Sequence, residues 1–218
     1  MDLRRLVLGI LLNMRMKFRI NEIFQSIQGE GLMVGIPMNF IRFCRCNRNC
    51  LWCDTDFEDG KEMEITEIID KLNESLPWVS LTGGEPMLEE NLAHMIRRLK
   101  TENFKILLET NGTLFNEEVF LLCDFVSVDL KGPSSGNEGY NEYTLSYCLK
   151  NPEKTQLKVV IQNDGDLNFF KRVYQDEYPN WVLQPEWKSM DRLDYHRIIE
   201  EFPRVRIIPQ IHKVMRVR

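Results

Sequence analysis

Short runs of β-branched and other apolar residues alternate along this chain with stretches in which apolar residues recur at helical spacing. The apolar runs predict strands at 38–43, 78–82, 105–109, 125–129, 156–161, 181–184 and 205–208. The stretches between them predict helices at 65–75, 88–100, 116–122, 141–149, 167–174 and 193–200. Such alternation is typical of an α/β fold in which right-handed crossovers join parallel strands.

The number of predicted strands limits the architecture. About six or seven parallel strands are too few for a closed eight-unit barrel, so the pattern favours a partial (open) parallel βα barrel. A doubly wound sheet is the alternative. A further strand is expected at 18–24, after a basic segment. We therefore expect a basic N-terminal extension at 1–17 and a single domain at 18–218.

Polar residues end four of the predicted strands, namely Thr82, Glu109, Asp129 and Gln184. Each of them taken singly has a simpler interpretation as a turn former. However, the carboxyl ends of parallel strands meet at one edge of the sheet, where ligands bind in such folds. Together the four residues predict a polar pocket at that edge.

Composition narrows the class of protein. The 28 basic and 33 acidic residues give a net charge of −5, which argues against direct nucleic-acid binding because that needs a basic face. The apolar stretch Leu6–Leu12 is far shorter than the ~20 residues of a membrane span. No small-residue cleavage site follows it, so we expect neither secretion nor a membrane anchor.

Four of the six cysteines, Cys44, Cys46, Cys50 and Cys53, lie within ten residues. So tight a cluster indicates metal ligation rather than a disulfide framework, and it favours a reducing cytoplasm. The C-x3-C-x2-C spacing of the last three fits three corners of a cubic iron–sulfur cluster, which leaves one iron open to a small molecule. If Cys44 also ligates, the site is instead a closed four-cysteine module that binds zinc or transfers electrons.

This spacing, after the first strand of a partial βα barrel, resembles the radical S-adenosylmethionine enzymes. A second landmark of that superfamily is the Gly83-Gly84-Glu85-Pro86 turn, where glycine lets the backbone approach a ligand closely. The resemblance is closest to the 7-carboxy-7-deazaguanine synthase family and runs from about Arg19 to the end. The segments that carry it, besides the cysteine loop, are 22–31, 40–42, 109–113, 183–185 and 210–213.

The resemblance implies a 4Fe–4S cluster held by Cys46, Cys50 and Cys53, with S-adenosylmethionine on the fourth iron. The residues that it places at the cofactor are Trp52, Cys53, Asp54, Gly83, Gly84, Glu85, Glu109, Asp129, Lys131 and Gln184. Those that it places at the substrate are Ile27, Gln28, Gly29, Glu30, Arg42 and Thr82. It further implies that Thr55 ligates a magnesium ion touching the substrate, and His212 is an additional candidate.

The activity that the resemblance implies is that of a ring-contracting lyase. A 5′-deoxyadenosyl radical would start the conversion of 6-carboxy-5,6,7,8-tetrahydropterin to 7-carboxy-7-deazaguanine, with loss of ammonia. The product belongs to the queuosine-type pathway of tRNA modification, although tRNA itself need not bind. The implied partners are an electron-donor protein such as flavodoxin or ferredoxin and a second copy of the chain in a homodimer.

The sequence departs from the family pattern in two places. Arg45 stands where the family usually has glycine, and Asp129-Leu130-Lys131 replaces a Ser-Pro-Lys segment, so that only Lys131 matches. An Asp-x-Lys strand end looks more like the activating enzymes that install glycyl radicals in a protein partner. Such an activase is the alternative enzyme, and the Gln28-Gly29-Glu30 loop argues against it.

Overall fold

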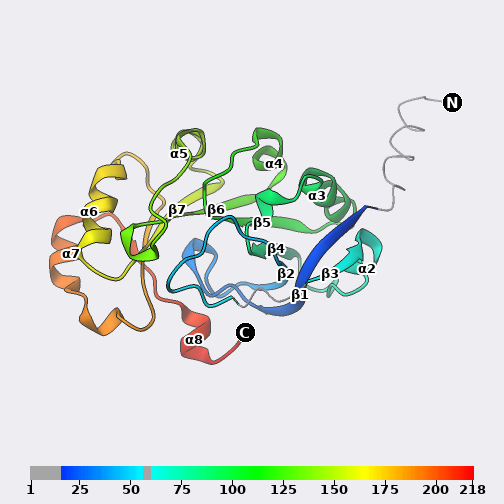
Figure 1. Ribbon diagram of the computed structural model, residues 1–218, viewed down its shortest axis with the longest axis horizontal. Coiled ribbons are helices and arrows are strands. Elements are labelled where there is room, and N and C mark those ends of the chain that lie inside the picture. The colour runs from blue at the N-terminus through cyan, green and yellow to red at the C-terminus, as the bar shows by residue number, and fades with distance from the viewer. Residues whose placement is uncertain (1–15, 56–59) are drawn as a thin grey trace.

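The computed structural model describes residues 16–55 and 60–218, and its centre is one mixed sheet (Figure 1). Within these residues the sheet has nine strands in the order β3-β1-β2-β4-β5-β6-β7-β8-β9. Their bounds are β1 Lys17–Ile27, β2 Pro37–Phe43, β3 Lys61–Glu64, β4 Trp78–Gly83, β5 Lys105–Thr110, β6 Phe125–Leu130, β7 Thr155–Ile161, β8 Trp181–Pro185 and β9 Arg206–Ile207. All neighbouring strands from β2 to β9 are parallel, and β1 pairs antiparallel with β2 and β3.

Helices follow most of the strands, and all but the first and last of those described connect two parallel strands. They are α2 Ile65–Ile69, α3 Leu92–Thr101, α4 Glu117–Leu122, α5 Glu142–Lys150, α6 Asp164–Val173, α7 Tyr195–Glu201 and α8 Ile211–Met215. Figure 1 shows α3, α4 and α5 along one side of the sheet, whereas α8 and the loop after β2 lie on the other side. No helix in the described ranges is long and apolar enough to cross a membrane.

Alternation along the strands separates the two faces of the sheet. In β7, Leu157 and Val159 belong to the main hydrophobic core under the helices, and Lys158 between them does not. In β6, Val128 belongs to the same core, whereas its neighbour Asp129 does not. Because successive side chains of a strand point to opposite faces, one face is apolar and covered by helices while the other carries polar groups.

These observations confirm the predicted α/β class and the open, mostly parallel sheet. The seven predicted parallel strands coincide with β2 and β4–β9 to within two residues at each end. The apolar stripe of Leu92, Met95, Ile96 and Leu99 on α3 is buried, as helical spacing predicts.

Several boundaries were predicted wrongly. The helix expected at 65–75 ends as α2 at Ile69, and the one expected from 88 begins at Leu92, after a 3-10 turn at Pro86–Leu88. The short strand β3 was missed, because its sequence Lys-Glu-Met-Glu lacks an apolar run. Of the extension expected at 1–17, residues 1–15 lie outside the described residues, and Lys17 begins β1.

Candidate active site

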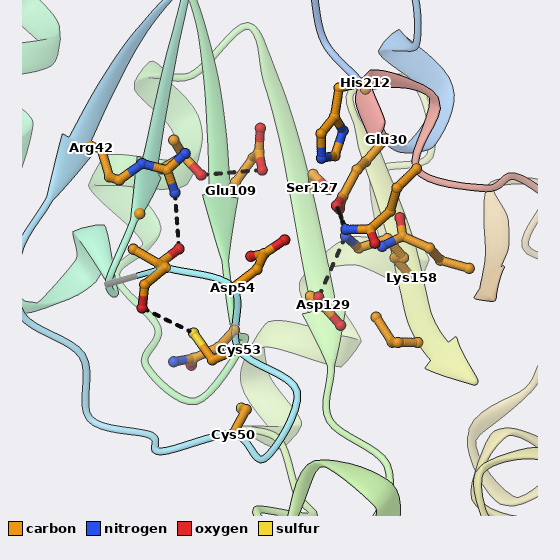
Figure 2. A pocket seen from close by; sticks show the side chains of 18 of the residues that line it. Glu30, Arg42, Cys50, Cys53, Asp54, Glu109, Ser127, Asp129, Lys158 and His212 are labelled. Carbon is orange, nitrogen blue, oxygen red and sulfur yellow. Dashed lines mark hydrogen bonds and ion pairs between the residues drawn. The ribbon is translucent and has the colours of Figure 1, made fainter. Parts of the chain in front are cut away.

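A cavity of about 520 Å³ opens where the parallel strands end at their carboxyl ends. Four parts of the chain line it: the loop after β1, the cysteine loop after β2, the ends of β4 to β8, and the segment around α8. In Figure 2, Cys50 and Cys53 lie on one side of the view, with Glu30 and His212 on the other. This is the edge at which ligands bind in parallel α/β folds.

The structure brings together all but one of the site residues predicted from the sequence. Those lining the cavity are Ile27, Gln28, Gly29, Glu30, Arg42, Cys46, Cys50, Trp52, Cys53, Asp54, Thr55, Thr82, Gly83, Gly84, Glu109, Asp129, Lys131, Gln184 and His212. The exception is Glu85, which is fully buried outside the lining. Their individual roles stay predictions, but their placement in one cavity is a finding.

Three free thiols lie on the cysteine loop and border the cavity, namely those of Cys46, Cys50 and Cys53. Burial raises the pKa of the Cys46 and Cys50 thiols, and the nearby Cys53 raises both further. Lys131 lowers both, since an ammonium favours a neighbouring thiolate. Thiolates so grouped are the donors that iron–sulfur clusters use, and the residues present therefore fit such a cluster.

Cys44 does not join these thiols. It is 8% exposed and absent from the cavity lining, and its Sγ donates to the Arg19 carbonyl oxygen at 3.4 Å. A zinc module needs its ligands around one ion, whereas in a cubic cluster each cysteine binds a different iron. The geometry thus disfavours the closed four-cysteine alternative.

The glycine turn after β4 packs directly on the start of the cysteine loop. Gly84 N donates to the Phe43 carbonyl at 2.9 Å, and Glu85 N donates to the Arg45 carbonyl at 2.6 Å. A Cβ on Gly84 would lie 1.9 Å from the Arg45 carbonyl oxygen. Glycine is therefore required here by contact between two backbone segments, which the sequence had attributed to approach of a ligand. The Arg45 side chain points outward and pairs with Glu89 at 3.0 Å, so this departure from the family pattern is accommodated.

Glu85 connects this turn to β5 from a buried position outside the cavity lining. Its carboxylate accepts hydrogen bonds from Met87 N at 3.0 Å, and from Thr110 Oγ1 and Asn111 N at 2.7 Å each. Burial raises the pKa of Glu85, and these hydrogen bonds oppose the increase. Asn111 in turn donates to Asn47 Oδ1 on the cysteine loop at 2.8 Å. The observed contacts thus make Glu85 a support for the loop.

Glu109 organises the polar side of the cavity. Its carboxylate accepts from Gln28 Nε2 at 2.6 Å, from Ser80 Oγ at 2.8 Å and from Thr82 Oγ1 at 3.2 Å. Gln28 and Thr82, both predicted at the substrate, are therefore oriented by one carboxylate from β5.

Arg42 lines the cavity and bonds the predicted residue Thr55 on one side and Glu22 on the other. Its Nε donates to Glu22 Oε1 at 2.8 Å, and one terminal nitrogen donates to Thr55 Oγ1 at 2.9 Å. Its guanidinium also lies 5.4 Å from the centre of the Phe24 ring, which stacks on Phe40 at 5.0 Å. The cavity therefore has a flat aromatic wall beside a cationic donor.

The sequence analysis missed Lys158, which Figure 2 shows between Glu30 and Asp129. Its side chain is 6% exposed, and its ion pairs join Glu30 and Asp129. The available signal was Lys158 within the run Leu157–Ile161, whose other residues are all apolar, since lysine is seldom buried without a partner. Other lining residues that were not assigned to the site are Phe24, Phe40, Arg48, Thr110, Asn111, Ser127, Val160, Glu186, Gln210, Lys213, Val217 and Arg218.

An open, mostly parallel sheet with three free thiols beside a polar cavity at its carboxyl edge is the arrangement expected of a radical S-adenosylmethionine enzyme. The Radical SAM superfamily pattern indeed matches residues 40–148. The chain is 38% identical over 204 residues to the 7-carboxy-7-deazaguanine synthase of Thermoplasma acidophilum, covering 90% of this chain and 96% of that protein. It is 30% identical over 209 residues to the synthase of Aquifex aeolicus, covering 89% and 91%. This chain belongs to the 7-carboxy-7-deazaguanine synthase family.

Solved structures agree on the fold. The crystal structure of QueE from Escherichia coli superposes with a TM-score of 0.70 at 22% identity, over 93% of this chain and 97% of that chain. Streptococcus suis SuiB gives a TM-score of 0.54 at 11% identity, over 75% of this chain and 46% of that chain. Membership of the radical SAM superfamily implies a 4Fe–4S cluster and S-adenosylmethionine.

Proposed function

We propose that this chain converts 6-carboxy-5,6,7,8-tetrahydropterin to 7-carboxy-7-deazaguanine with loss of ammonia, as a lyase of the family to which it belongs. The observation that carries the proposal is the cavity itself. It sets the three thiols of the cysteine loop beside a polar wall built on Glu109, Gln28 and Arg42. The two parts that such a reaction needs, a loop for the cluster and a site for a flat polar ring, thus border the same cavity.

Cys46, Cys50 and Cys53 would hold the cluster, which together with S-adenosylmethionine supplies the radical chemistry. Two buried acceptor atoms support a ligand in the same cavity. Within the described part of the chain, Asp129 Oδ1 and Gln184 Oε1 have no hydrogen-bond partner, and both residues line the cavity. Buried polar atoms are normally satisfied, so these two oxygens are suited to accept from donors of a bound cofactor. The part of the cavity lining proposed to contact the cofactor also includes Trp52, Asp54, Gly83 and Lys131.

The substrate would lie against the other wall. A pterin is flat and carries donors and acceptors along its edge, which suits the stacked Phe24–Phe40 pair and the amide of Gln28. Arg42 supplies a cation for the substrate carboxylate, because a guanidinium can donate two parallel hydrogen bonds to it. Glu30 supplies an acceptor on the far side. These residues orient the substrate and exclude water, and orientation alone lowers a reaction barrier by several kcal/mol.

We also propose that Thr55 ligates a magnesium ion, with substrate oxygens and water as the other ligands. Replacing Thr55 with alanine removes a hydroxyl that borders the cavity beside Arg42. We expect the magnesium concentration for half-maximal activity to rise about tenfold or more, because a hard cation loses a protein oxygen. Iron per chain should stay at the wild-type value. The Thr101→Ala variant on α3 serves as a matched control, and equal loss of iron in the Thr55 variant would contradict the assignment.

Finer features follow from the family resemblance and extend the proposal. They are reduction of the cluster by a flavodoxin- or ferredoxin-type protein, a homodimeric assembly, a cytoplasmic location, and a product that serves queuosine-type tRNA modification. Support for direct binding of small molecules rather than of tRNA comes from the net charge of −5.

The test of the function is a product assay. The protein is reconstituted anaerobically with iron and sulfide, then incubated with the carboxylated tetrahydropterin, S-adenosylmethionine, magnesium and a strong reductant. We expect deazaguanine product, detected by mass spectrometry, in an amount that exceeds the enzyme. A preparation that cleaves S-adenosylmethionine but forms no deazaguanine would refute the proposed substrate and revive the activase alternative.

A further inference from the structure

Lys158 occupies an unusual position in the sheet. It lies in β7, all of whose residues are buried, and its ammonium is on the polar face that borders the cavity. That ammonium forms an ion pair with Glu30, on the loop after β1, and lies 3.4 Å from Asp129 Oδ2, at the end of β6. One buried cation thus joins a residue on the proposed substrate side to a residue on the proposed cofactor side (Figure 2).

Charged and polar groups from several neighbouring elements face the Glu30–Lys158 ion pair. Gln210 Nε2 donates to the second Glu30 oxygen at 2.6 Å, so both oxygens of that carboxylate are engaged. Lys131 Nζ lies 3.0 Å from the same Asp129 oxygen that Lys158 approaches. The charged or titratable groups facing the pair are Glu109 from β5, Asp129 from β6, Lys131 just after β6, and His212 from α8.

The two partners hold each other in the charged form. Burial by itself would raise the pKa of Glu30, but the charge and hydrogen bond of Lys158 lower it to about 2. Burial would likewise lower the pKa of Lys158, but Glu30 and Asp129 raise it above its usual value. Glu30 is therefore a carboxylate at neutral pH and an acceptor only. Without the ammonium, burial would dominate, and Glu30 would take up a proton at a higher pH.

Stability does not account for such an arrangement. A buried ion pair is often no more stabilising than an apolar pair of similar volume, because removing both charges from water is costly. In the sheet register Lys158 lies between Asp129 of β6 and the buried Val182 of β8, so only one of its two neighbouring strands offers it a charged partner. The feature left to explain is why a cation sits between two cavity carboxylates.

We propose that Lys158 is a positioning residue, whose ammonium fixes the Glu30 carboxylate in one orientation and charge state and couples it to Asp129 across the cavity. The inference rests on the proposed function and deepens it, since it states how the two binding regions are aligned. Lys158 does not need to touch the substrate, because it acts through Glu30.

The experiment measures binding of the carboxylated tetrahydropterin by equilibrium dialysis to the cluster-loaded enzyme, without reductant, so that no turnover occurs. The variants are Lys158→Met, Lys158→Arg, Glu30→Gln and the double variant Glu30→Gln/Lys158→Met. We expect Lys158→Met to raise the Kd about tenfold at neutral pH, as is common for residues sharing one network. The Kd of that variant should rise further as the pH falls toward about 5.5, because Glu30 then becomes protonated, whereas the wild type should change little.

Two comparisons distinguish a positioning role of Lys158 from a general disruption of the structure by its replacement. In the Glu30→Gln background, Lys158→Met should add less than about a twofold change, because its effect passes through Glu30. Lys158→Arg should recover most of the affinity. Lys100→Met is the matched control, because Lys100 pairs with Asp124 at 2.9 Å and lies outside the cavity lining. An unchanged Kd in Lys158→Met, or equal losses in both backgrounds, would overturn the inference.

A measurement without pterin distinguishes failure of this inference from failure of the proposed function. If the wild type neither binds nor converts the pterin, the proposed function fails. In that case the Glu30–Lys158 pair is tested by the midpoint temperature of thermal unfolding, measured for the same cluster-loaded variants. A double variant whose midpoint departs from the sum of the single shifts supports Lys158 as the residue that holds Glu30, and strict additivity overturns it.

Discussion

The Cys50→Ala variant is expected to lose its cluster and, with it, more than about 100-fold in activity, since even outer partners of metal ligands cost roughly 10- to 100-fold. Cys50 borders the cavity with Cys46 and Cys53, and each of these three would hold a different iron. Two remaining thiolates leave a second iron without a protein ligand. Iron and sulfide analysis after anaerobic reconstitution, together with the visible absorption of the cluster, measures the loss directly.

Cys44→Ala is the control for this result. The Cys44 thiol is buried against the Arg19 carbonyl and does not reach the cavity. Removing one buried sulfur should cost about 1 kcal/mol of unfolding free energy, as for other small truncations in a core. Cluster content and the response of its spectrum to S-adenosylmethionine should both persist. Loss of iron from Cys44→Ala comparable to that from Cys50→Ala would instead establish a four-cysteine site.

The second large effect is expected for Gly84→Ala. The added Cβ would stand 1.9 Å from the Arg45 carbonyl oxygen, and that atom belongs to backbone that cannot simply rotate away. The turn and the cysteine loop must separate, which weakens the hydrogen bond from Glu85 N to Arg45. We expect about 2–3 kcal/mol of lost unfolding free energy from overpacking. A displacement of about 1 Å at the cluster loop should also lower activity roughly 100-fold.

Gly35→Ala provides the comparison for that variant. Gly35 has a φ of +88°, yet a Cβ there meets no atom within 4 Å. Its replacement therefore costs only the backbone strain of about 1–2 kcal/mol and should leave cluster content intact. Urea unfolding and product formation, measured for both variants, separate strain from collision. If Gly84→Ala keeps the stability and activity of the wild type, the proposed contact between the turn and the cysteine loop is not essential.

The fold was predictable to a large extent because its signals are local. Each parallel strand is a short apolar run, and each connecting helix buries a stripe at helical spacing, so both are readable within about ten residues. The boundaries were less predictable. The helix expected from 167 begins at Asp164, because Asn163 and Asp166 form a capping box that the apolar pattern does not reveal. Strand β3 is an edge strand whose four residues include three charged ones, so it gave no apolar signal.

The candidate site likewise has features that the local sequence predicted and contacts that it did not predict. The cysteine spacing and the glycine turn are local, and they indicated the superfamily directly. Lys158 was missed because its partners are distant in sequence: Glu30 precedes it by 128 residues. The contact between Gln28 and Glu109 similarly spans 81 residues. Pairings of this kind depend on the order of strands in the sheet, which a single sequence does not disclose.

The sequence by itself determined the class of this protein, because periodicity and ligand spacing are properties of neighbouring residues. Only the tertiary structure decided which way each side chain faces. It turned Cys44 away from the cavity and buried Glu85 beside β5, outside the lining. It also set Lys158 between two acids. The physical reason is that side chains alternate between the two faces of a strand, so register and strand order assign each one to the core or to the cavity.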